Sequence, residues 1–154
     1  MALIEKKLAE MGIELPEAPK PVASYVSAVR TGNLIITSGQ LPRVGGKMLY
    51  EGIVGKNVTP EQAKECARLC AIVNLALIKS LIGDLDKVTR FVRLGVFVAS
   101  SPDFTNHPMI ANGASDLLQE IFGEKGQHAR STVGMAVLPL NAPVEIEMMV
   151  EVKD

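Results

Sequence analysis

Apolar residues recur at spacings of three and four between positions 60 and 82, which is the period of an α-helix with one buried face. Thr59 stands before Pro60, and Gln62 follows Thr59 by three residues, a combination typical of a capped helix start. Gly83 predicts the end of the helix. The face that we expect to pack against a sheet or another helix consists of Ala63, Cys66, Ala67, Cys70, Val73, Leu77 and Leu81.

Two further stretches have the helical period. Residues 109–122 form the second predicted helix, which ends at Gly123, and residues 124–127 then form a loop. Near the N-terminus, residues 3–11 alternate between an apolar and a charged side, which predicts a short amphipathic helix. Three prolines among residues 15–21 indicate an extended connector that leads into the first strand.

Period-two alternation and β-rich runs predict the strands. Residues 25–30 and 33–38 form a hairpin around Thr31-Gly32, and a turn at Gly45-Gly46 leads into a short run at 47–50. The alternation predicts a long strand at 88–98, with one face made of Val92, Leu94, Val96 and Val98. Two last strands are expected near 131–138 and 144–152.

The predicted order is therefore β-β-(β)-α-β-α-β-β after an N-terminal extension at residues 1–21. Each main helix has one apolar stripe, so the economical architecture is α+β: a mixed β-sheet with two helices packed on one face. The 154 residues suit a single domain with one core. We expect that domain to span residues 1–154.

Charge and composition exclude some classes of function. The net charge is -1 and aromatic residues make up only 4%, so neither electrostatic attraction nor base stacking favours nucleic acid or an anionic membrane as a partner. The N-terminal residues mix charges with apolar side chains, and no run reaches about eighteen uncharged apolar residues. We therefore expect a cytoplasmic protein. Cys66 and Cys70 lack further ligands nearby, which indicates buried small residues rather than a metal site.

The residues with candidate chemistry begin at Arg130. Arginine stays charged and binds a carboxylate through two parallel hydrogen bonds, so an arginine fixed in a strand predicts a small-acid site. Alternation places Arg130, Thr132 and Gly134 on one face of their strand. Glu145 and Glu147 follow on the next strand. They point to the same cleft or to solvent, and a structural ion pair between one of them and Arg130 at a subunit interface is the alternative interpretation.

Other polar residues have weaker claims. His107 and His128 are the two histidines and thus the obvious acid–base candidates. The position of His107 at a helix start favours a loop or capping role, and His128 is close enough to Arg130 to reach the mouth of the cleft, but we expect neither to be essential. Ser131 lacks partners at a spacing that would make it a nucleophile. A phosphate loop at Gly45-Gly46-Lys47 is excluded by its missing flanking residues. Within the second helix, three polar residues are candidates for lining a neighbouring subunit's cleft: Asn112, Ser115 and Asp116.

The element order and four segments, 33–42 (NLIITSGQLP), 129–133 (ARSTV), 138–139 (LP) and 144–147 (VEIE), resemble the YjgF family, also called Rid or L-PSP endoribonuclease. The resemblance covers about residues 22–152. It implies a chorismate-mutase-like α+β fold and a homotrimer with ligand clefts between subunits. It also implies hydrolysis of small enamines and imines to a 2-keto acid and ammonia, without metal or organic cofactor.

The same resemblance assigns roles to individual residues. Arg130 matches the arginine that grips the substrate carboxylate, and Glu145 matches the glutamate that positions or activates water. Ser38 and Gly39 match the pair that lines the cleft, and Tyr25 matches its aromatic gate. Thr132 replaces the usual cysteine of that site.

The chain also departs from the family pattern. Besides Thr132, Gly134 stands where an acidic residue is usual, Ala23-Ser24 replaces Gly-Pro, and the segment at 104–122 is longer. These departures leave two alternatives to an imine deaminase. The first is a non-catalytic module that binds small carboxylates, and the second, less favoured by the charge, is an endoribonuclease.

Overall fold

The computed structural model describes residues 2–21 and 23–154. Their helices are α1 (Leu3–Glu10), α2 (Pro60–Ile82) and α3 (His107–Phe122), and short 3₁₀ turns occupy 85–87, 123–126 and 139–141. The strands are β1 (Ala28–Thr31), β2 (Leu34–Thr37), β3 (Arg43–Val44), β4 (Lys47–Met48), β5 (Val88–Ala99), β6 (Ala129–Met135) and β7 (Val144–Val152).

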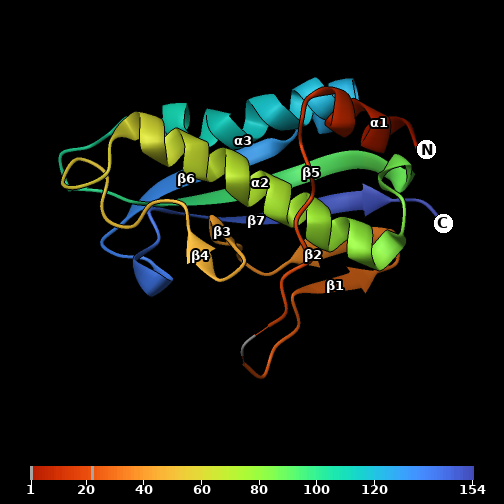
Figure 1. The fold of residues 1–154 in the computed structure, drawn as a ribbon, viewed down its shortest axis with the longest axis horizontal. Helices are drawn as coiled ribbons and strands as arrows, with labels where there is room; N and C mark the ends of the chain where they lie inside the picture. The colour runs from red at the N-terminus through yellow and green to blue at the C-terminus, as the bar shows by residue number, and fades with distance from the viewer. Residues whose placement is uncertain (1, 22) are drawn as a thin grey trace.

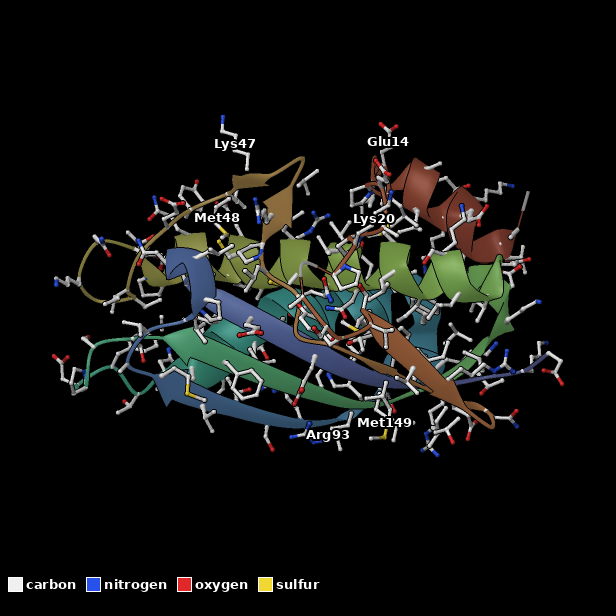
Figure 2. The ribbon with its side chains drawn as sticks, turned by 90° about the horizontal axis from the view of Figure 1, so that it is seen from below. Glu14, Lys20, Lys47, Met48, Arg93 and Met149 are labelled. Atoms are coloured by element: carbon white, nitrogen blue, oxygen red, sulfur yellow. The ribbon has the colours of Figure 1, made fainter. Side chains whose placement is uncertain are left out.

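Five strands form a mixed sheet in the order β1-β2-β7-β5-β6, and β3 and β4 form a separate hairpin. The β5–β6 pair is parallel and the other neighbours are antiparallel, as the crossover through α3 requires. Helices α2 and α3 cover one face, with α1 at the end near the C-terminus (Figure 1). Figure 2 shows Arg93 and Met149 pointing away from the helices on the other face. The predicted α+β architecture is confirmed.

Helix α2 begins as its sequence predicts. Thr59 Oγ1 accepts the Gln62 amide at 3.1 Å, and Gln62 Oε1 accepts the Thr59 amide at 3.0 Å, which completes a capping box. Cys66 and Cys70 are buried, as expected. The expectation for Leu81 is wrong, because its side chain is 48% exposed while Ile82 is buried at the end of the same stripe.

A β-bulge in β5 overturns its predicted alternation. The pairing with β7 shifts between Phe91 and Arg93, so one extra residue is inserted there. Phe91 and Leu94 are consequently both fully buried toward the helices. Val92 was predicted to lie on that face with Leu94, and this prediction is wrong. Beyond the bulge, alternation continues through Val98.

Three predicted boundaries are wrong. Strand β1 starts at Ala28 rather than at 25, because its partner β2 leaves the sheet after Thr37. Strand β6 spans 129–135 rather than 131–138, because its partner β5 ends at Ala99. Helix α3 starts at His107, two residues before the predicted start.

The N-terminal extension is docked on the domain through α1. This helix has no side-chain cap of its own, and Asp86 supplies one: its carboxylate accepts the amides of Leu3 and Ile4, each at 2.8 Å. The Ile4 hydrogen bond is the main cause of the lowered pKa of Asp86. Leu8 is buried, and Glu5 pairs with Lys79 at 3.0 Å.

Among residues 2–21 and 23–154, every helix is too short or too polar to cross a lipid bilayer.

Candidate functional site

Arg130 lies on the edge strand β6 and its side chain points toward α3. Its Nη1 donates to Asn112 Oδ1 at 2.8 Å and to Ser115 Oγ at 3.1 Å. Both acceptors are neutral and stand three residues apart, hence on one face of the helix. Asn112 and Ser115 therefore hold the Arg130 of their own chain, and their place at a neighbouring subunit's cleft stays a prediction. Asp116 is exposed beside them.

His128 extends this cluster. Its Nδ1 lies 2.6 Å from the Gly126 carbonyl, and its Nε2 lies 2.8 Å from Ser115 Oγ. One proton arrangement satisfies all contacts: Nδ1–H donates to the carbonyl, Ser115 Oγ–H donates to Nε2, and Arg130 donates to Ser115. Burial lowers the pKa of His128, and the Arg130 cation lowers it further, although the Gly126 contact opposes both. The histidine is thus held neutral as part of the support of Arg130.

The guanidinium of Arg130 is half-buried and has no anionic partner among the residues that the structure describes. Within one chain, the described residues include no ion pair between Arg130 and Glu145 or Glu147, and the alternative of such a pair across a subunit interface stays a prediction. Glu147 instead lies 3.7 Å from Arg93 on the open face of the sheet. Withdrawing a cation from water is costly without a counter-charge, so Arg130 is a candidate for binding an anion.

Glu145 lies on β7, which β5 separates from β6, and its side chain faces the opposite side of the sheet from Arg130. The two strands lie about 10 Å apart, so the two side chains do not meet within one chain. Glu145 packs against Gly39, where any Cβ would overlap its carboxylate. Burial raises the pKa of Glu145, and the Glu147 carboxylate raises it further.

Gly39 also joins Tyr25 in the wall of a hollow of about 150 Å³ beside β1 and β2, together with Lys20 and Arg43. Tyr25 is exposed and precedes β1, so it lies in the connector and not in a strand as predicted. Ser38 is adjacent, and its hydroxyl donates to the Val26 carbonyl at 2.7 Å.

A buried polar network anchors this end of β2. Thr37 Oγ1 donates to Asn74 Oδ1 at 2.9 Å and accepts the Met148 amide at 2.9 Å. Asn74 Nδ2 donates to the carbonyls of Cys70 at 2.9 Å and Ile146 at 3.2 Å. Thr37 precedes Ser38 and Gly39, and Ile146 follows Glu145 directly. This network therefore sets the position of Gly39 and Glu145.

Thr132 and Gly134 share the face of Arg130, as alternation predicted. The Thr132 hydroxyl is buried without a hydrogen-bond partner in the described part of the chain. A Cβ at Gly134 would lie 2.7 Å from His107 Nε2 and 2.9 Å from Ser100 Oγ. Glycine at this position therefore leaves room for the side chain of His107 from α3. His107 was predicted to lie in a loop or at a cap, and it is the first residue of that helix.

The predicted residues thus form two groups in one chain. Arg130 and Thr132 lie on the helix-facing side of the β6 edge, and Tyr25, Ser38, Gly39 and Glu145 lie at the β1–β2 end and on the open face. Sequence reasoning missed the contacts of Asn112, Ser115 and His128 with each other and Arg130. Their only signal was the i, i+3 spacing of Asn112 and Ser115 on a helix that must fold back onto β6.

The raised pKa of Glu145 predicts a pH-dependent stability difference. Its pKa is higher in the folded chain than in the unfolded one, so its favourable contribution is complete below the unfolded value and is lost as pH rises through the folded value. Glu145→Gln should therefore gain stability relative to wild type between pH 4 and pH 7. Denaturant unfolding at both values measures this, with the exposed Glu120→Gln as control. A relative loss of stability on raising the pH would contradict it.

Residues 5–152 match the family described as "YjgF/chorismate_mutase-like, putative endoribonuclease". Protein TCP17 of Trypanosoma cruzi is 44% identical over 154 residues, covering 98% of this chain and 95% of the relative. A 2-iminobutanoate/2-iminopropanoate deaminase of Dermatophagoides farinae is 33% identical over 141 residues, with 92% and 95% covered.

Among solved structures, that of Atu1372 from Agrobacterium tumefaciens, a protein of unknown function, superposes with a TM-score of 0.91. It is 46% identical, and the match covers 98% of this chain and 93% of that one. The family resemblance and the chorismate-mutase-like fold are both confirmed. The chain belongs to the YjgF/Rid family.

Proposed function

We propose that this protein hydrolyses the C=N bond of small 2-imino acids and their 2-enamino tautomers. Water adds to the imine carbon, the C–N bond then breaks, and one 2-keto acid and one ammonia are released per water consumed. The observation that supports this most directly is the half-buried Arg130 cation, which has neutral supports and no counter-charge among the described residues. The deaminase names of several relatives agree with it.

Arg130 binds the substrate carboxylate in this proposal. Its Nη1 is engaged by Asn112 and Ser115, which leaves Nε and Nη2 to form the two parallel hydrogen bonds of a carboxylate clamp. The fixed acid group holds the imine carbon in place for attack. Glu145 accepts a proton from the attacking water, a role that its raised pKa favours because a more basic carboxylate is a better proton acceptor.

Arg130 and Glu145 come together only if two chains contribute to one site. Arg130 lies at the β6 edge of the sheet, whereas Tyr25 and Gly39 lie toward the β1–β2 edge. Association of one edge with the other edge of a second copy is head-to-tail, and such contacts form a ring when the rotation between copies closes. We propose the smallest such ring, a homotrimer with a cleft at each subunit boundary.

The open face of the sheet supports this assembly. It exposes Val29 (50%), Ile36 (41%) and Val133 (44%), which strand pairing places on the same side as Glu145. Apolar side chains gathered on one sheet face are typical of an interface. Sedimentation equilibrium at micromolar concentration should give three times the chain mass, and a monomer would contradict the shared cleft.

The reaction is tested by generating the imines in the assay mixture itself. An amino acid oxidase generates 2-iminopropanoate from alanine, semicarbazide traps the imine that remains, and ammonia release is followed with and without the protein. We expect the protein to accelerate release and to lower the trapped fraction. Unchanged rates across a panel of imines would exclude the deaminase.

A binding module without turnover is the second candidate. It is favoured by Thr132 and Gly134, which place neither a thiol nor a carboxylate beside Arg130. In that case 2-keto acids should raise the melting temperature while imine hydrolysis stays at its uncatalysed rate.

A further inference from the structure

A second hollow lies at the C-terminal end of β6, on the face that carries Arg130. Its volume is about 300 Å³. Pro102, Phe104, Met135 and Ala136 provide mostly apolar walls. Ser100 Oγ and His107 Nε2 lie 3.0 Å apart at its polar part, and the Phe104 ring meets the His107 ring edge-on at 5.1 Å.

Gly134 keeps this hollow open. A Cβ there would lie 2.7 Å from His107 Nε2 and 2.9 Å from Ser100 Oγ, distances that real side chains do not adopt. Any larger residue would displace the Ser100–His107 pair and fill the space. The polar pair and the glycine thus form one arrangement, and neither Arg130 nor its supports use it.

The spacing along α3 relates this pair to Arg130. Arg130 Nη1 is held at Asn112 and Ser115, which follow His107 by five and eight residues. At 1.5 Å per residue they lie about 8 to 12 Å from it along the helix axis, and Gly134 follows Arg130 by four residues, or about 13 Å, along β6. A ligand that reaches both Arg130 and the Ser100–His107 pair must therefore span several ångströms between its two hydrogen-bonding ends.

This span decides which part of a substrate reaches His107. The imine carbon is bonded directly to the carboxylate carbon, so it stays close to Arg130. The far end of a side chain of a four- or five-carbon acid reaches Ser100 and His107. We propose that the hollow is the side-chain subsite, and that the protein prefers 2-imino acids whose side chain ends in an uncharged hydrogen-bonding group such as a carboxamide.

The lining of the hollow supports an uncharged group. Its residues include no lysine, arginine, aspartate or glutamate, so a side-chain carboxylate would be desolvated without a full counter-charge. A wholly apolar end would leave without a partner the hydrogen-bonding capacity of the Ser100 hydroxyl that its bond to His107 does not use. A carboxamide both donates and accepts hydrogen bonds, as the Ser100–His107 pair does, and its methylenes contact Phe104 and Met135.

The proposal rests on the deaminase function for its catalytic test, and a binding test separates the two. The substrates are the imines of glutamine, glutamate and homoleucine, whose side chains have nearly the same shape, and of alanine. The ligands for binding are the four corresponding 2-keto acids. Wild type should favour the glutamine series over the homoleucine and glutamate series by about tenfold or more in kcat/KM and in affinity.

The matched variants are Gly134→Val and Ser100→Ala, with the exposed Asp103→Asn of the same turn as control. Each of the first two should abolish the tenfold preference while leaving the alanine series within about twofold, since a short side chain does not reach the hollow. Equal losses across all four series would overturn the subsite, as would a wild type that binds the four keto acids alike. Selective binding without hydrolysis would support the subsite and refute the deaminase.

Discussion

Replacement of Arg130 by alanine is expected to lower kcat/KM for imine hydrolysis by about 100-fold or more, because it removes both charge-assisted hydrogen bonds to the substrate carboxylate. Arg130→Lys keeps the charge but loses the planar pair of donors, so it should recover only part of the activity. Binding of 2-keto acids, measured by calorimetry, should weaken in parallel.

Folding should not explain that loss. Arg130 has no ion pair among the described residues, so its removal relieves an uncompensated charge. Circular dichroism and the melting temperature should therefore change little. Arg90→Ala, an exposed arginine on the neighbouring strand, is the matched control and should keep full activity. Full activity in Arg130→Ala would remove the basis of the proposed reaction.

Gly113→Ala is expected to destabilise the fold by about 2 to 4 kcal/mol, which lowers the melting temperature by roughly 5 to 15 °C. Gly113 is buried where α3 contacts α2, and a Cβ there would overlap the backbone carbonyl of Lys64. Backbone atoms cannot move aside without separating the two helices.

The sign of this effect is what makes it informative. Within a helix, alanine normally stabilises relative to glycine by about 0.5 to 1 kcal/mol, so propensity alone predicts the opposite result. Gln119→Ala, on an exposed position of the same helix, should change stability by less than about 0.5 kcal/mol. A Gly113→Ala variant as stable as wild type would mean that α2 and α3 can shift apart at little cost.

Short sequence patterns predicted the features that depend only on neighbouring residues. The capping box at Thr59 and the common face of Arg130, Thr132 and Gly134 follow from bonds between near neighbours and from strand alternation. The β5 bulge at Phe91 could not be predicted, because it depends on how the chain pairs with β7.

The sequence also could not predict which face of β6 packs against the helices. Ser131, Val133 and Met135 are the more apolar set, yet Arg130 and Thr132 face α3. Apolar character normally indicates the buried side of a strand, but here the open sheet face carries apolar residues as well, among them Val29, Ile36 and Val133. With apolar residues on both faces, alternation cannot say that Arg130 and Glu145 lie on opposite sides.

The Asn74–Thr37 network also determines how α2 can change during evolution. Apolar packing tolerates sliding, because one methyl group can replace another, whereas the Asn74 amide bonds α2 to two fixed points, Thr37 of β2 and Ile146 of β7. A chain that loses the amide leaves the buried Thr37 hydroxyl without the acceptor of its proton. Substitutions at the two positions should therefore be coupled, and the register of α2 on the sheet should persist while its other core residues vary.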